Sequence, residues 1–152
     1  MQLKSLKIYS DGGARGNPGP ASSAFVVFLD GKIIHREAHY LGIKTNNEAE
    51  YSGICQALDW VKKYELNGDI SLVNFFLDSE LVAKQLSGEY KVKNENLKKY
   101  FLTAKKSEKE LLKNIFYTPI AREKNKVADK MVNEELDRFL NLNPNEKRQN
   151  FT

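Results

Sequence analysis

The twelve residues YSDGGARGNPGP, from Tyr9 to Pro20, constrain the fold more than any other part of the chain. Four glycines follow a single aspartate, Asp11, as they do in some turns that cradle phosphate. The spacing fits neither the G-x-G-x-x-G pattern nor a Walker loop with its terminal Gly-Lys-Ser/Thr. An apolar, β-branched segment follows Pro20 where those folds begin a helix, so the helix N-terminus that binds phosphate is missing. The stretch therefore predicts a tight turn between two antiparallel strands.

Hydrophobic periodicity predicts three strands in succession and then an alternation of helices with two more strands. The dipeptide Asp30-Gly31 is a strong hairpin signal between the second and third strands. The expected strands are 6–11, 24–29, 32–40, 71–77 and 114–118. The expected helices run from 45–47 to 64, through a short segment ending at 86, and over 95–112 and 125–139. Because the later strands are reached through helices, this order predicts a mixed sheet with helices packed on it, an α/β fold.

Length and composition bound the class of protein. A chain of 152 residues with 41% hydrophobic and 29% charged residues is expected to form one globular domain, at 1–140, with a polar and flexible tail at 141–152. There is no apolar run of the ~20 residues that span a bilayer and no apolar core of a secretory signal, so a cytoplasmic protein is expected. The net charge of +4 tolerates a polyanionic partner. The single cysteine, Cys55, leaves no internal disulfide and is expected in the core.

Two glutamates, Glu48 and Glu50, lie in the segment TNNEAE at the start of the first expected helix. An α-helix places them about 200° apart, so they cannot serve the same site. Glu50 shares a face with apolar residues such as Ile54 and Leu58, whereas Glu48 is expected to point toward solvent. A carboxylate on a core-facing stripe costs free energy unless it is paired or binds a metal. A residue at the edge of the stripe that reaches water is the alternative for an isolated Glu50.

Three other acids occupy comparable positions. Asp11 is expected at the end of the first strand, and Asp78 ends FFLD, the most apolar strand of the chain. Asp129 lies near the apolar stripe of the last helix. Since neighbouring strand ends lie about 5 Å apart, these three carboxylates can converge with Glu50. Four like charges would raise one another's pKa values unless divalent cations neutralised them, and all-oxygen ligands favour Mg²⁺ or Mn²⁺.

Five blocks of the chain, taken in order, resemble type 1 ribonuclease H: YSDGGARGNPGP, TNNEAEYSGICQAL, LDSELVAKQL, VKNENL and REKNKVADKMVN. The resemblance covers residues 6–137 and implies a ribonuclease H-like fold, a five-stranded mixed sheet in the order 3-2-1-4-5 flanked by helices. Residues 1–140 are accordingly expected to form a catalytic domain, and the protein is expected to be a monomer. It also implies hydrolysis of the RNA strand of RNA/DNA hybrids with two Mg²⁺ ions, or Mn²⁺ in their place, leaving 5′-phosphate and 3′-hydroxyl ends.

Matched position by position, the resemblance makes Asp11, Glu50, Asp78 and Asp129 the catalytic and metal-binding residues. In T-N-N-x-x-E the catalytic glutamate of the family is the last residue, which selects Glu50 over Glu48, as the helix geometry does. Asp11 would bridge two ions that activate the attacking water and stabilise the leaving 3′-oxygen.

The substrate contacts implied by the resemblance lie in the same blocks. Asn17, Asn46 and Asn47 match residues that resemble readers of the minor groove, where the 2′-hydroxyls of RNA are displayed. Thr45 and Asn94 match members of a pocket that holds a phosphate of the DNA strand.

The chain departs from the family's pattern in several places. Ile43 stands where an arginine is frequent, and Glu80 stands where many members have glutamine, so two favourable contacts with the hybrid are missing. A protrusion rich in tryptophan and lysine is absent before VKN, which leaves dispersed lysines to attract phosphate. The four expected to do so are Lys91, Lys93, Lys98 and Lys99.

The loop before Asp129 lacks the histidine that the family often carries, because the only histidines are His35 and His39 in the third strand. The loop sequence IAREKN resembles a histidine-free subgroup found in archaea and some bacteria, in which Arg122 and Glu123 occupy the region as auxiliary residues. Some members of that subgroup are said to attack RNA/RNA duplexes, so an RNA/RNA duplex stays open as a second substrate.

Two other functions stay open at this point. The first is a catalytically silent nucleic-acid-binding module, against which the intact set of four acids argues. The second is the ribonuclease domain of a reverse transcriptase, cut from a longer chain. The initial methionine and the lack of a polymerase region favour a free-standing protein.

Overall fold

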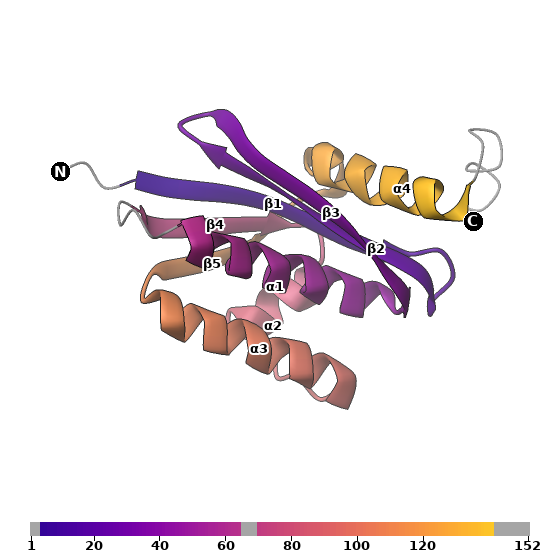
Figure 1. Ribbon diagram of the computed structural model, residues 1–152. Helices are drawn as coiled ribbons and strands as arrows, with labels where there is room; N and C mark the ends of the chain where they lie inside the picture. The colour runs from indigo at the N-terminus through magenta and orange to yellow at the C-terminus, as the bar shows by residue number, and fades with distance from the viewer. Residues whose placement is uncertain (1–3, 65–69, 142–152) are drawn as a thin grey trace.

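A computed structural model describes residues 4–64 and 70–141 of the chain. Its centre is a five-stranded sheet in the order β3-β2-β1-β4-β5 (Figure 1). The strands are β1 (Lys4–Ala14), β2 (Gly19–Leu29), β3 (Lys32–Lys44), β4 (Ile70–Leu77) and β5 (Asn114–Pro119). The helices are α1 (Asn46–Tyr64), α2 (Glu80–Leu86), α3 (Glu95–Leu111), the short 3-10 helix η2 (Arg122–Lys124) and α4 (Lys126–Leu140). The predicted element order and sheet topology are confirmed, while the predicted tail lies outside the described residues from 142 onward.

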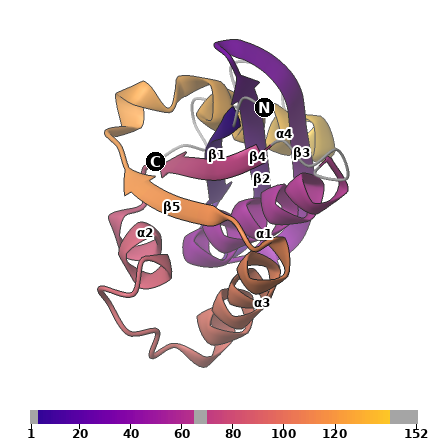
Figure 2. The ribbon, with the colours of Figure 1, turned by 90° about the vertical axis from the view of Figure 1, so that its left-hand side faces the viewer.

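Helices cover the two faces of the mixed sheet unequally. Strand β2 runs antiparallel to both β1 and β3, whereas β4 runs parallel to both β1 and β5. One face is packed against α1 and α3, and α4 lies on the other (Figures 1 and 2). The larger core therefore joins Ile8 and Phe75 of the sheet to Ile54 of α1. The smaller core joins Ala24 of β2 to Val132 and Leu136 of α4.

The first three strands are longer than the sequence predicts. Pairing between β1 and β2 continues past Asp11, which lies opposite Ala24, as far as Ala14 opposite Ala21. Glycine, serine and alanine fill this extension, and such residues give little hydrophobic periodicity from which a strand could be recognised. The predicted turn is correct in kind but shorter, since the backbone N–H of Arg15 already donates to the carbonyl of Pro20 at 2.8 Å.

Helix α1 lies directly on the backbone of β1. A Cβ atom added to Gly12 would lie 2.2 Å from the carbonyl carbon of Ala49, and one added to Gly53 would lie 3.2 Å from the carbonyl oxygen of Asp11. Only glycine permits the first of these approaches. Gly12 therefore brings the start of α1, which carries Glu50, against the strand that carries Asp11.

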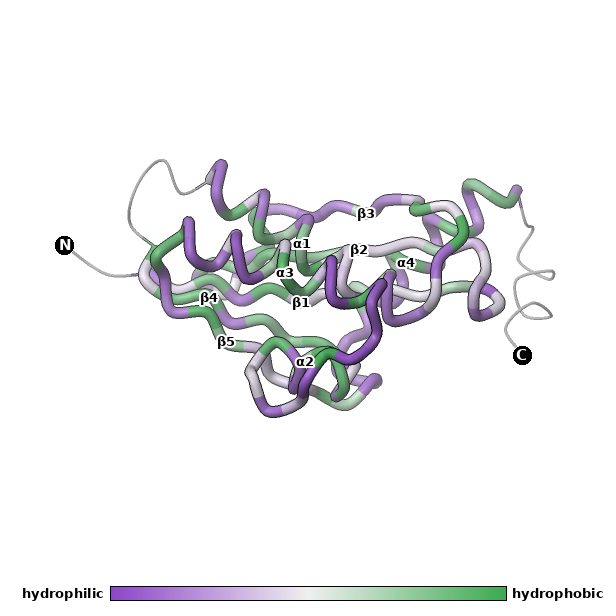
Figure 3. The backbone as a smooth tube through the Cα atoms, turned by 90° about the horizontal axis from the view of Figure 1, so that it is seen from below, coloured by the Kyte–Doolittle hydropathy of each residue, from purple (hydrophilic) through white to green (hydrophobic). Residues whose placement is uncertain are grey.

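Hydropathy follows this layering (Figure 3). The middle of β3, at one edge of the sheet, and the segment that leads into α3 are hydrophilic. Strand β4 lies between β1 and β5 and is largely apolar, whereas most residues of β5, at the other edge, are exposed. Cys55 is half-buried against the larger core, and burial raises the pKa of its thiol to about 12. None of the helices in the described part of the chain has the length and apolarity that crossing a membrane requires.

Candidate active site

Two of the predicted acids are brought together by neighbouring parallel strands. Tyr9 of β1 pairs with Phe76 of β4, so the same register carries Asp11 toward Asp78, two residues further along each chain. Asp78 follows the last residue of β4, as predicted. Asp11 does not end its strand, because the ladder with β2 continues for three more residues. The prediction of a strand end at Asp11 is therefore wrong, although the carboxylate lies where two strands bring it beside Asp78.

The third acid comes from the start of α1. Glu50 is 5% exposed, which confirms that it faces inward. Glu48 does not simply point to solvent: its Oε1 accepts from the backbone N–H of Thr45 at 3.0 Å, and the backbone N–H of Glu48 donates to the Thr45 hydroxyl at 3.1 Å. This reciprocal pair is a capping box, whose T-x-x-E signature is present in the sequence. It fixes the start of α1 and thereby the position of Glu50.

The carboxylates of Asp11, Glu50 and Asp78 form a compact cluster, with one oxygen of each lying within 4.8 Å of the others. Burial, and then the charge of Asp78, raise the pKa of Asp11 to about 7. Burial, followed by the charges of Asp11 and Asp78, raises the pKa of Glu50 well above its ordinary value. The Oε2 atom of Glu50 is buried and has no hydrogen-bond partner among the described residues. An all-oxygen set with an unpartnered buried acceptor suits a hard divalent cation such as Mg²⁺ or Mn²⁺.

Asp129 lies in the first turn of α4 and lines the same cavity as the three clustered acids. It is not within the 4.8 Å group, but its charge contributes to the raised pKa of Asp11. Arg122 of η2, one of the predicted auxiliary residues, lies 3.6 Å from the Asp129 carboxylate and lines this cavity too. The other, Glu123, instead lines a separate pocket beside β1.

The asparagines predicted to contact substrate link the β1–β2 turn to the start of α1. The side-chain oxygen of Asn17 accepts from the backbone N–H of Asn46 at 2.9 Å. The side-chain oxygen of Asn46 in turn accepts from the backbone N–H of Ala14 at 2.8 Å. Asn46 and Asn47 line the cavity of about 640 Å³ that contains the acids. Asn46 and Asn47 therefore lie at the rim of that cavity, and Asn17 is linked to it through Asn46.

The remaining predicted substrate residues lie outside that cavity and begin helices. Thr45 takes part in the capping box of α1, and Asn94 caps α3 by accepting from the backbone N–H of Leu97 at 3.0 Å. The four predicted lysines, Lys91, Lys93, Lys98 and Lys99, are all exposed on or just before α3. Lys99 also lines a shallow hollow of about 300 Å³ with Lys44.

Two polar residues that the sequence analysis did not single out connect β1 and the β1–β2 turn to α4 and the residue before it. Arg15, in the β1–β2 turn, forms a buried ion pair with Asp137 at 2.6 Å. Asn125 precedes α4 and donates from its side-chain nitrogen to the carbonyl of Ser10 at 2.8 Å. The place of Asn125, just before the last predicted helix, marks a helix start, but nothing in the sequence indicates the partner of either residue.

The chain is similar in sequence to a known protein family and to several of its members. The family model described as RNase H matches residues 3–137 of the chain. Ribonuclease HI of Halobacterium salinarum is 36% identical over 136 residues, which cover 87% of this chain and 64% of that protein. The bifunctional protein Rv2228c of Mycobacterium tuberculosis is 35% identical over 132 residues, which cover 86% of this chain. The chain spans only 35% of the length of the mycobacterial relatives.

A solved structure resembles the fold closely. The crystal structure of LC11-RNase H1 in complex with an RNA/DNA hybrid superposes with a TM-score of 0.85 and 39% sequence identity. The match covers 89% of this chain and 99% of that chain. The likeness therefore extends over both the sheet and the helices that carry the acids.

Proposed function

Given that the chain belongs to the RNase H family, we propose that it is an endoribonuclease that hydrolyses the RNA strand of RNA/DNA hybrids. Residues 1–140 form its catalytic domain, and the products carry 5′-phosphate and 3′-hydroxyl ends. The observation that carries the proposal is the cluster of Asp11, Glu50 and Asp78, buried or half-buried, with carboxylate oxygens within 4.8 Å of one another. The similarity to an RNase H1 that was crystallised with an RNA/DNA hybrid supports the substrate class.

Asp11, Glu50 and Asp78 would hold the metal, with Asp129 at the edge of the same cavity completing the set. Two Mg²⁺ ions, or Mn²⁺ in their place, supply activation of water and stabilisation of the leaving oxygen when they are bound. The protein's part is to keep these carboxylates close together in spite of their repulsion. It does so by seating Glu50 against β1 through Gly12 and by aligning Asp11 with Asp78 through strand register.

The surroundings of the cavity suit a duplex. Asn46 and Asn47 at its rim can donate and accept hydrogen bonds, and Asn17 lies within hydrogen-bonding distance of Asn46, so the three can read the minor groove together. Thr45 and Asn94, at the starts of α1 and α3, would form part of a pocket for a phosphate of the DNA strand, because a helix N-terminus favours an anion. Arg122 at the opposite rim offers a cation beside Asp129. RNA/RNA duplex is a second substrate to be tested, because the loop carries no histidine.

The test incubates the protein with end-labelled RNA/DNA, RNA/RNA and DNA/DNA duplexes in Mg²⁺, Mn²⁺ or EDTA. We expect cleavage of the RNA strand of the hybrid with either metal and none in EDTA, and the labelled ends identify the products. Binding of hybrid without cleavage in any metal would support a silent binding module and overturn the proposal.

A further inference from the structure

The face of the sheet on which α4 packs is open along the first half of β1. Leu6 and Ile8 are buried in the larger core with α1, so the alternation of the strand places Ser5, Lys7 and Tyr9 on the opposite face. Helix α4 reaches the far end of that face, where Val132 meets β2, and leaves the near end without a helix.

Four aromatic rings, from β1, β2, β4 and β5, lie on the same face of the sheet as Lys7. Phe28 of β2 pairs with Lys7, and Phe76 of β4 pairs with Tyr9. The Tyr9 ring stacks on that of Phe76 at a centroid distance of 5.0 Å and meets that of Phe28 edge-on at 5.5 Å. Phe116 of β5, one strand further, is 55% exposed. We call Tyr9, Phe28, Phe76 and Phe116 the aromatic face.

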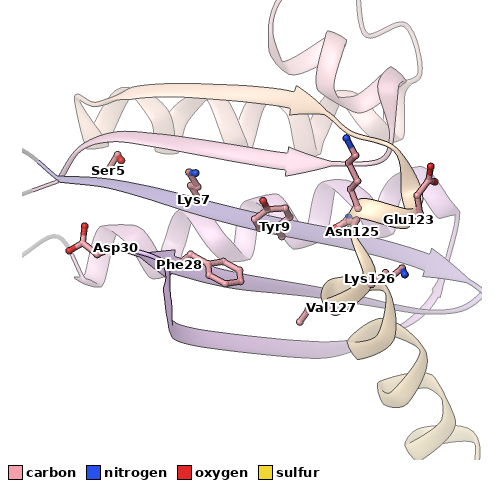
Figure 4. A pocket seen from close by; sticks show the side chains of 11 residues that line it. Ser5, Lys7, Tyr9, Phe28, Asp30, Glu123, Asn125, Lys126 and Val127 are labelled. Carbon is pink, nitrogen blue, oxygen red and sulfur yellow. The ribbon is translucent and has the colours of Figure 1, made fainter.

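A cavity of about 530 Å³ lies between Tyr9 and Phe28 of the aromatic face and the start of α4 (Figure 4). Lys7, Lys124 and Lys126 line it, and no salt bridge within the described part of the chain pairs any of the three with an acid. The acids that line the same cavity, Asp30 and Glu123, are outnumbered by these lysines. The cavity is thus positively charged next to aromatic rings.

Asn125 contributes a buried acceptor to this cavity. It is 1% exposed, and its side-chain oxygen is buried without a hydrogen-bond partner among the described residues. The side chain donates to Ser10 and does not cap α4. The first backbone N–H groups of α4 therefore have no side-chain cap, and the positive end of the helix dipole adds to the charge of the lysines.

We propose that the aromatic face and its cavity bind single-stranded nucleic acid. Bases stack on Tyr9, Phe28 and Phe116, whose rings accept any base, while Lys7, Lys124 and Lys126 attract the phosphates. The oxygen of Asn125 is an acceptor that the residues around the cavity leave without a partner. An apolar protein partner would leave the lysines uncompensated, whereas nucleic acid supplies both phosphates for the lysines and bases for the exposed rings.

This inference rests on the proposed function, because the single-stranded nucleic acid would come from a hybrid bound at the acids. Asp11 and Tyr9 lie two residues apart on the same face of β1, roughly 7 Å along the strand. A single-stranded tail of a hybrid held at the acids would have to pass η2 and the start of α4, where Asn125 is bonded to Ser10, to reach the aromatic face.

The test measures fluorescence anisotropy of a labelled oligodeoxyadenylate and a labelled oligoriboadenylate, each of about twelve nucleotides, at low ionic strength in EDTA. We expect Lys7→Glu and Phe116→Ala each to weaken binding by about fivefold or more. Lys63→Glu, which makes the same charge change at an exposed residue of α1 on the other side of the sheet, is expected to change binding less than twofold. Since the assay needs no cleavage, its outcome is independent of whether the chain hydrolyses hybrid.

Equal losses for Lys7→Glu and Lys63→Glu, or no binding by the wild-type protein, would overturn the proposal. Sedimentation velocity supplies a second check, since a dimer that Phe116→Ala dissociates would make this face a protein interface instead. If a variant fails to fold, amide shift mapping on the wild-type protein decides. Asn74 of β4 lies between Lys7 and Phe116 and pairs with both. Shifts at these three residues on adding oligodeoxyadenylate support the site, and shifts confined to α3 refute it.

Discussion

Asp11 and Lys7 lie on one face of one strand, four residues apart, but in opposite surroundings. At the acid end, α1 and α4 close over β1, Asp11 is 6% exposed, and burial raises its carboxyl pKa to about 7. At the open end no helix in the described part of the chain covers Lys7, which is exposed beside half-buried aromatic rings. The strand is common to both ends, so the helices placed over it decide what each charge does. A buried carboxylate is stabilised by a cation, whereas an exposed lysine remains available to bind an anion.

The largest effect is expected from substituting Asp78, one of the three clustered acids. Asp78→Asn removes one charged oxygen donor from the cluster, so hybrid cleavage should fall by about 10³-fold or more while hybrid binding is kept. Relief of repulsion should mildly stabilise the metal-free fold. Single-turnover cleavage and thermal unfolding in EDTA measure both. Asp59→Asn, at an exposed acid of α1, is the control, and full activity of Asp78→Asn would remove Asp78 from the mechanism.

The packing of α1 on β1 can be disrupted at Gly12. Gly12→Ala places a methyl group 2.2 Å from the Ala49 backbone, so α1 must move away from β1, and we expect a loss of about 3 kcal/mol in the free energy of unfolding. Gly13→Ala is a matched control, since the nearest atom there is 3.8 Å away. Urea denaturation of the pair measures the difference. Equal stabilities would show that the close approach of α1 does not constrain the site.

The raised pKa of Asp11 predicts that the stability of the metal-free protein depends on pH. Between the unfolded pKa of 3.8 and the folded value of about 7, the unfolded carboxyl binds fewer protons than the folded one. The stability of the metal-free protein that is due to this group is therefore complete below pH 3.8 and is lost as the pH rises to about 7. The loss should be on the order of 4 kcal/mol.

Denaturation in EDTA at several pH values between about 4.5 and 7.5, for wild type and Asp11→Asn, isolates this contribution. The wild-type curve should fall relative to the variant as the pH rises, and Mg²⁺ should flatten it by favouring the ionised carboxylate. Parallel curves would mean that burial does not perturb Asp11.

The smallest effect is expected at the open end. Phe116→Ala removes a ring that is 55% exposed, so the free energy of unfolding should change by less than about 1 kcal/mol. Phe75→Ala, at a fully buried ring of the neighbouring strand, should cost about 3–5 kcal/mol. Thermal denaturation compares them. A large loss for Phe116→Ala would mean that its ring serves the fold and would weaken its assignment to a binding face.

The sequence predicted the order of the elements and the sheet topology, because periodicity and turn residues are local properties of the chain and the family resemblance gave the strand order. It also chose Glu50 over Glu48 from helix geometry, and the burial of Glu50 confirms that choice. It failed at the end of β1, where small residues hide a strand, and it missed the capping role of Glu48 although T-x-x-E was there to be read. The roles assigned to the four acids and to the substrate residues remain predictions for the experiments above.

What the sequence determined by itself was the set of acids and the elements that carry them, since backbone propensity and the alternation of apolar residues act over a few positions. The tertiary structure alone decided which acids meet, how far burial raises their pKa values, and that Arg15 pairs with Asp137 across the fold. It also decided that α4 stops short of Lys7 and leaves the aromatic face open. These outcomes depend on how closely helices pack on the sheet, and that distance is set by long-range contacts that no local pattern encodes.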